Sequence, residues 1–214
     1  KVIALSKADE CTAVLAGAIS GNIRFALNNV STSGIVDNTE LAVTVARDRG
    51  GVLIVAPEPR AVDRMEAALR EHVAARQVTV LSAGLGPESR YRRYLDILHG
   101  SGRLVVGTRS AAYAPVRDLR LAVILDDGDD NLTDPRAPYV HAREVLVTRS
   151  AQEGAALILA SLTRTAEVQQ LVETGWAHTL VPTTETLAAS MPGVIASTDT
   201  IRSEEHTSEL QSHI

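Results

Sequence analysis

Residues 121–132 read LAVILDDGDDNL, an apolar run that stops abruptly at four aspartates grouped around one glycine. The apolar residues are continuous rather than alternating, which is typical of a strand that is buried on both faces of a parallel sheet. The aspartates then stand at the carboxyl end of that strand, where open α/β sheets bind their ligands. This stretch therefore predicts both a fold class and the position of a site.

Four other apolar runs of strand length share this pattern, at residues 52–56, 78–82, 104–107 and 156–160. Helical patterns lie between several of them, and strands that alternate with helices predict an α/β fold with a largely parallel sheet. One more short strand is predicted at residues 193–196, after a stretch that has the composition of a linker.

Two helices are predicted in detail. In residues 59–76, one helical face carries apolar side chains, namely Val62, Met65, Leu69 and Val73. In residues 87–100, Pro87 suits the first helical turn and Gly100 ends the helix, with a shared face formed by Tyr91, Tyr94, Leu95 and Leu98.

The composition limits the class of protein. Of the 214 residues 45% are hydrophobic but only 3% aromatic, so the core must be aliphatic. A net charge of −5 implies neither a nucleic-acid nor a membrane partner, and the single Cys11 excludes an internal disulfide and a cysteine-rich zinc site. Because no apolar run approaches the roughly 20 residues of a membrane span, we expect a cytoplasmic protein without a membrane partner.

Both ends of the chain differ from its middle. Both lysines and four of the five asparagines lie in residues 1–38, a shift that marks a domain boundary, a linker or a frame error. Residues 202–214, RSEEHTSELQSHI, resemble the translation of a common short-read sequencing adapter, so we expect them to stand outside the fold and the natural protein to continue beyond residue 201. A polar C-terminal helix is the alternative.

The acidic turn has two interpretations. Of two carboxylates at a strand end, such as Asp126 and Asp127, one commonly holds the Mg²⁺ that neutralises a nucleotide phosphate, and the other orients an attacking water. A polar turn explains the same residues, because Asp and Gly are favoured in loops. A phosphate site also needs a glycine-rich loop that ends in Lys-Ser or Lys-Thr, and this chain has no such loop and no lysine after Lys7.

Two arginine-bearing segments are candidates for phosphate contact. Thr108 and Arg109 directly follow an apolar run, so backbone N–H groups and an arginine there suit a phosphate, although a helix cap with a surface arginine explains them too. Arg90, Arg92 and Arg93 form a small basic cluster on their helix, for which a solvated face is the preferred interpretation over DNA binding.

Three further strings carry a family resemblance: VVGTRSA at 105–111, YVHARE at 139–144 and LASLT at 159–163. In this order, with LDDGDD between the first two, they resemble the first RecA-like domain of the primosomal protein N-prime (PriA) family of bacterial replication-restart helicases. The arginine-rich composition is most similar to the actinobacterial branch. The resemblance covers about residues 40–181 and consists of four motifs in register.

The resemblance implies a fold, an activity and a set of roles. The fold is a RecA-like, P-loop NTPase-type three-layer sandwich with a mostly parallel sheet, as in lobe 1 of superfamily-2 helicases. The activity is that of a 3'-5' DNA helicase that uses ATP and Mg²⁺. Asp126 and Asp127 would be the catalytic acids, with Asp126 on the metal. The single-stranded DNA backbone would contact Thr108, Arg109 and Ser110, and ATP hydrolysis would be coupled to DNA movement by Ser161 and Thr163.

The resemblance also implies partners. These are single-stranded or forked DNA, other primosome components and single-strand-binding proteins, whereas the zinc of the family lies outside this chain. The expected organisation is an uncertain N-terminal region at 1–38, a RecA-like domain at 39–181, a linker at 182–201 and the foreign tail at 202–214.

This chain departs from the family pattern at its ATPase motifs. Asp127 replaces a glutamate and is one methylene shorter, Gly128 replaces an acid, and Asp129 replaces a histidine. Misplacing a catalytic group by such a distance costs on the order of 10² in rate. We therefore expect a degenerate ATPase with no intact nucleotide site, which acts in DNA binding and primosome assembly.

Two alternatives remain. One is a Mg²⁺-dependent phosphotransfer or receiver-type α/β domain that uses Asp126 and Asp127, and it would need a lysine at the tip of its last strand. The other is a purely structural α/β scaffold, which would leave GTRSA at 107–111 unexplained.

Overall fold

The computed structural model of the protein describes residues 2–5, 24–28, 42–43, 45–46, 50–82 and 84–182. The strand predicted at 193–196, the linker beyond residue 182 and the adapter-like tail at 202–214 lie outside the described residues. None of the described helices combines the length and the apolar character that a bilayer crossing requires.

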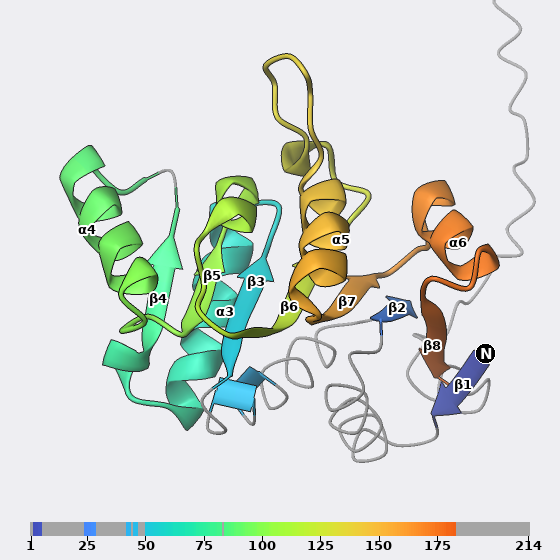
Figure 1. The fold of residues 1–214 in the computed structure, drawn as a ribbon, viewed down its shortest axis with the longest axis horizontal. Helices are drawn as coiled ribbons and strands as arrows, with labels where there is room; N and C mark the ends of the chain where they lie inside the picture. Colours follow the sequence, from blue (N-terminus) through green and yellow to red (C-terminus); the bar gives the residue numbers. More distant parts are fainter. Residues whose placement is uncertain are drawn as a thin grey trace, which may run out of the picture.

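In the described part of the chain, eight strands form one sheet in the order β1-β8-β2-β7-β6-β3-β5-β4 (Figure 1). Every pairing between these strands is parallel. The strands are β1 (Val2–Leu5), β2 (Arg24–Asn28), β3 (Gly51–Val55), β4 (Val78–Leu81), β5 (Leu104–Gly107), β6 (Leu119–Leu125), β7 (Ala156–Ser161) and β8 (His178–Pro182). The five apolar runs correspond to β3–β7, so the predicted α/β class with a parallel sheet is confirmed.

The described helices lie along the strand connections. They are α3 (Pro59–His72), α4 (Pro87–Leu98), α5 (Ala142–Glu153) and α6 (Ala166–Glu173), with short 3₁₀ turns η1 (Ala75–Gln77), η2 (Arg109–Tyr113) and η3 (Asp130–Leu132). The first predicted helix ends at His72 rather than at residue 76, because the chain turns into η1 before β4.

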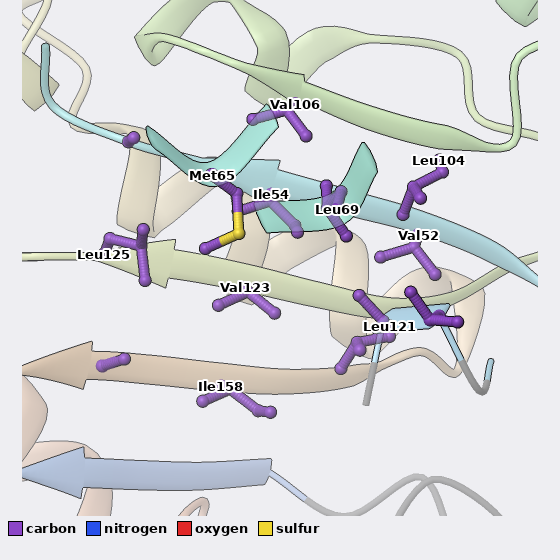
Figure 2. Packing of buried hydrophobic residues seen from close by; sticks show 14 of the residues in the cluster. Val52, Ile54, Met65, Leu69, Leu104, Val106, Leu121, Val123, Leu125 and Ile158 are labelled. Atoms are coloured by element: carbon purple, nitrogen blue, oxygen red, sulfur yellow. The ribbon is translucent and has the colours of Figure 1, made fainter. Parts of the chain in front are cut away.

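Each face of the sheet has its own aliphatic core. On one face Val52, Ile54 and Val123 pack against Met65 and Leu69 of α3, and these side chains are almost completely buried (Figure 2). The opposite core joins alternate strand residues to side chains of α4, η2, α5 and α6; its members include Leu53, Val55, Val105, Ile97, Ala111, Leu146 and Val168. Burying one such aliphatic side chain contributes about 1.5–3 kcal/mol. Burial on both faces explains the continuous apolar runs and forms the predicted three layers.

The predicted apolar face of α4 is wrong. Tyr91 is 65% exposed and Tyr94 41% exposed, and the buried residue of this helix is Ile97. The guanidinium of Arg93, one turn before Ile97, donates to the Val80 carbonyl of β4 at 2.7 Å, so the 93–97 face lies against the sheet. Because β4 is the edge strand, α4 covers only the sheet margin and buries a narrow stripe.

Candidate functional site

The acidic turn leaves β6 at the carboxyl edge of the sheet. Asp126 adopts a left-handed backbone conformation with φ 51°, which Asp tolerates better than most residues. Its N–H donates to the Ala160 carbonyl of β7 at 2.7 Å, and the Asp129 N–H donates back to the Asp126 carbonyl at 2.9 Å. The Asp129 carboxylate caps η3 by accepting from the Asn131 N–H at 2.8 Å. Part of the cluster therefore stabilises the turn, as the polar-turn interpretation expects.

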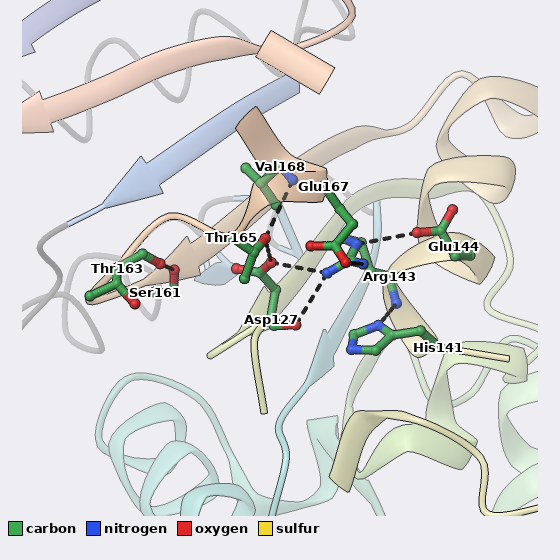
Figure 3. A network of polar contacts seen from close by, with 9 residues as sticks. All are labelled: Asp127, His141, Arg143, Glu144, Ser161, Thr163, Thr165, Glu167 and Val168. Carbon is green, nitrogen blue, oxygen red and sulfur yellow. Dashed lines mark hydrogen bonds and ion pairs between the residues drawn. The ribbon is translucent and has the colours of Figure 1, made fainter. Parts of the chain in front are cut away.

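Asp127 points away from solvent and is only 1% exposed. Its Oδ2 accepts a hydrogen bond from Thr165 Oγ1 at 2.7 Å and lies 3.3 Å from Nη1 of Arg143 (Figure 3). The same Nη1 is 3.3 Å from the Asp127 carbonyl oxygen. The carboxylate is thus compensated by a buried cation and a hydroxyl.

Arg143, which is 6% exposed, is the centre of this network. Its Nε lies 3.2 Å from Glu144 and its Nη2 lies 3.7 Å from Glu167 in the first turn of α6. The backbone N–H of Arg143 donates to Nδ1 of His141, the residue that caps α5, at 3.0 Å. Burial, and next the charge of Arg143, lower the pKa of His141. The network ties the turn after β6 to the starts of α5 and α6.

Asp126 is more accessible than Asp127, because the residue lies at the surface and its carboxylate is only partly buried. Partial burial, and next the charge of Asp129, raise its pKa, whereas the charge of Arg64 on α3 lowers it. Within the described ranges, no three His, Cys, Asp or Glu side chains are placed to hold one metal ion. A carboxylate with a raised pKa beside one that is buried and already bound is a poor donor set for Mg²⁺.

The GTRSA segment begins where β5 ends. The Thr108 N–H donates to the Leu81 carbonyl of β4 at 3.1 Å, and Thr108 then leads into η2. Arg109 donates from Nη1 to the carbonyls of Asn131 and Thr133, each at 3.0 Å, so its guanidinium braces the loop after the acidic turn. Ser110 is exposed. Thr108, Arg109 and Ser110 thus lie together at the carboxyl ends of the strands, beside the η3 loop.

Gly107 has a steric role at the start of this segment. A Cβ there would lie 2.3 Å from the Leu81 carbonyl oxygen and 2.6 Å from Cβ of Ala111. Only glycine therefore lets β4, β5 and η2 approach one another this closely.

The predicted coupling residues lie at the end of β7, with Ser161 as its last residue and Thr163 in the loop that follows, and they interact with each other. Ser161 Oγ donates to the Thr163 carbonyl oxygen. The side chain from this loop that reaches the acidic turn is Thr165, the N-cap of α6, whose role sequence reasoning missed. A threonine directly before a helical pattern is a recognisable cap signal, but nothing in the string indicates that its hydroxyl also binds Asp127.

A parallel sheet covered by helices on both faces, with an acidic turn at the tip of one strand, defines the class as a RecA-like α/β domain. The Hef helicase domain of Pyrococcus furiosus superposes on 86% of this chain with a TM-score of 0.60 and 12% identity, and the chain covers 40% of it. The UvsW helicase of bacteriophage T4 matches 78% with a TM-score of 0.52 and 14% identity, and the chain covers 58% of it. At these identities the likeness shows the fold alone.

Sequence relatives identify the family within that class. The probable replication restart protein PriA of Mycobacterium leprae is 45% identical over 166 residues, 78% of this chain, and that of Mycobacterium tuberculosis is 45% identical over 160 residues, 75% of this chain. The Synechocystis protein is 31% identical over 73% of this chain. No family model matches the chain. The chain is a partial homologue of the PriA family of replication restart proteins.

The chain spans about a quarter of the length of the mycobacterial relatives, 26% and 24%. Their higher identity relative to the Synechocystis protein agrees with the predicted actinobacterial branch. These likenesses favour the helicase-like interpretation over the phosphotransfer or receiver-type alternative.

Proposed function

We propose that this chain is the RecA-like lobe of a replication-restart protein that binds DNA at the carboxyl edge of its sheet and does not hydrolyse ATP. The observation that carries the proposal is the burial of Asp127 against Arg143 and Thr165. The family resemblance assigns to this position the group that activates water.

A general base must reach the water from which it takes a proton, and it needs a free lone pair in that direction. The carboxylate of Asp127 is closed off from solvent, and its Oδ2 already accepts from Thr165 and faces Arg143. A carboxylate that is closed off from solvent and engaged in this way is poorly placed to take a proton from a nucleophilic water, so in our proposal the second carboxylate of the turn acts as a structural anchor.

The rest of the ATPase equipment is also incomplete. The chain has no glycine-rich loop ending in Lys-Ser or Lys-Thr, so the usual stabilisation of a transferred phosphoryl group is missing from its sequence. ATP and Mg²⁺ are the cofactors that the family resemblance implies. Our proposal gives them no role in this lobe.

DNA contact is proposed at Thr108, Arg109 and Ser110. Ser110 is exposed, and Arg109 brings a permanent positive charge to the same edge while its guanidinium braces the η3 loop. Hydroxyl, arginine and backbone N–H groups are the usual donors to nucleic-acid phosphates. The proposed partner is single-stranded or forked DNA, and primosome components and single-strand-binding proteins are proposed partners by family resemblance.

The test is a titration of a labelled single-stranded oligonucleotide at several salt concentrations. Ser110→Asp places a negative charge at the proposed phosphate contact and should weaken binding, whereas its uncharged isostere Ser110→Asn should bind like the unaltered protein. If Arg109 contacts one phosphate, Arg109→Ala should make the slope of log affinity against log salt shallower by about 0.7. Arg70→Ala, at a half-exposed arginine on α3, is the matched control. Equal binding by Ser110→Asp and Ser110→Asn would refute the proposed interface.

A further inference from the structure

The surface of α4 is unusually aromatic for this chain. All four tyrosines of the sequence are exposed, and two of them, Tyr91 and Tyr94, lie one helical turn apart on α4. The aliphatic cores contain no tyrosine. These rings are therefore displayed at the surface of a protein that packs its interior without them.

The two rings border a hollow of about 480 Å³ that is also lined by Leu85, Pro87 and Arg90. Ligand pockets typically measure roughly 300–1,000 Å³, so the hollow has room for a flat aromatic group. The two tyrosines, the proline and the leucine contribute apolar lining atoms, and the arginine supplies charge. Base-stacking sites for single-stranded nucleic acids combine these same elements.

The charges of α4 suit an anionic ligand in the hollow. Glu88, the acid nearest in sequence, is paired with Arg92 at 2.8 Å, and Arg93 is held by the Val80 carbonyl. Arg90 is the arginine of this helix that lines the hollow. The solvated-face interpretation of the basic cluster therefore suits the exposed Arg92, whereas Arg90 adds a positive charge to the lining of the hollow.

The hollow adjoins the proposed DNA edge. β4 and β5 are neighbours in the sheet, and the Leu81 carbonyl that accepts from Thr108 belongs to the last residue of β4, directly before the connection to α4. Figure 1 shows α4 beginning at the same edge toward which the tips of β4 and β3 point. A strand that contacts residues 108–110 can thus continue onto the α4 hollow.

We propose that this hollow binds unstacked bases of single-stranded nucleic acid. Tyr91 and Tyr94 are the stacking surfaces, and Arg90 is the positively charged contact for a phosphate. The inference rests on the proposed function, because it extends the same DNA path and makes it selective for single strands. Bases inside a duplex are stacked on one another and cannot offer their faces to these rings.

The experiment measures the affinity of the 214-residue chain for a single-stranded oligonucleotide, the same strand with abasic positions, and the matching duplex. Tyr91→Leu combined with Tyr94→Leu should weaken binding of the normal strand about tenfold or more, and the abasic strand should bind as weakly to the unaltered protein. Tyr91→Phe combined with Tyr94→Phe keeps both rings and should retain affinity. Leu98→Ala changes an exposed residue of the same helix outside the hollow and should have no effect.

A second readout reports stacking directly. A 2-aminopurine base in the strand should lose fluorescence on binding the unaltered protein and keep it with the double Leu variant. If the Leu variant and the abasic strand bind unchanged while Ser110→Asp still weakens binding, the inference is overturned and the proposed function stands. If no strand binds at low salt, both are overturned. If the Leu substitutions change only self-association, the face is an interface between copies and the inference also fails.

Discussion

Replacing Arg143 by methionine tests the buried network most sharply. The substitution keeps an unbranched side chain in place but removes the guanidinium, which leaves the Asp127 carboxylate buried without its cation. The Arg143 side chain is 7% exposed and that of Asp127 1%. Water therefore cannot replace the lost partner.

The magnitude follows from the geometry. Opposite unit charges 3.3 Å apart attract by about 5 kcal/mol at an effective dielectric constant of about 20. Removal of one partner from a buried pair costs about 3–5 kcal/mol, because the remaining charge stays uncompensated. The exposed partners Glu144 and Glu167 add little, since surface pairs contribute about 0–1 kcal/mol. The variant should thus lose about 3–5 kcal/mol of unfolding free energy, with Tm lower by roughly 6–20 °C.

The assay is urea unfolding followed by circular dichroism and by the fluorescence of Trp176, the single tryptophan, which packs against the α5 and α6 face of the sheet. Arg92→Met is the matched control, because its pair with Glu88 is exposed and should contribute at most about 1 kcal/mol. On an Asp127→Asn background, Arg143→Met should cost much less. A loss of under about 1 kcal/mol, or the same loss on both backgrounds, would refute the proposed coupling.

Three further predictions concern neighbouring residues. Thr165→Val removes the hydroxyl that donates to the Asp127 carboxylate at 2.7 Å, so it should lower the unfolding free energy by about 1.5–3 kcal/mol in urea titrations; Thr148→Val, at an exposed helix hydroxyl, should cost less. Gly107→Ala places a Cβ against the Leu81 carbonyl oxygen and Ala111, so it should cost about 1–3 kcal/mol or more, and a neutral result by thermal melting would contradict the close packing. The pKa of Asp126 is raised in the folded protein above its ordinary value of 3.8, so the folded state holds this proton more tightly and stability falls as pH rises from 3.8 through the raised value. Asp126→Asn should therefore be more stable than the unaltered protein at neutral pH and no different below pH 3.8, as measured by urea unfolding across pH; an unchanged stability at neutral pH would exclude this effect.

The central strands could be predicted from sequence because burial on both faces makes them continuous apolar runs. β1 is itself a short apolar run, whereas β2 and β8 hold only two or three consecutive apolar residues between polar or proline ends. The places of all three in the sheet depend on pairing with distant segments. The face of α4 was misassigned for a related reason. Helical periodicity shows which residues share a face, but the sheet decides which face is buried, and here Arg93 and Ile97 turn inward.

At the site, the strand-end rule placed Asp126 and Asp127 correctly at the carboxyl edge of β6. The rule could not predict that the carboxylate of Asp127 is buried whereas Asp126 lies at the surface. That difference depends on Arg143 and Thr165, which lie 16 and 38 residues further along the chain. Their proximity to Asp127 is a property of the folded sheet and its two covering helices.

Calorimetric titration of MgATP into the 214-residue chain, alongside Asp127→Asn, tests most directly whether the acidic turn is a structural anchor rather than a nucleotide site. We predict no saturable heat of binding from either protein. Saturable binding that requires Mg²⁺ and is weakened by Asp127→Asn would contradict the assignment of Asp127 to the Arg143 and Thr165 network alone.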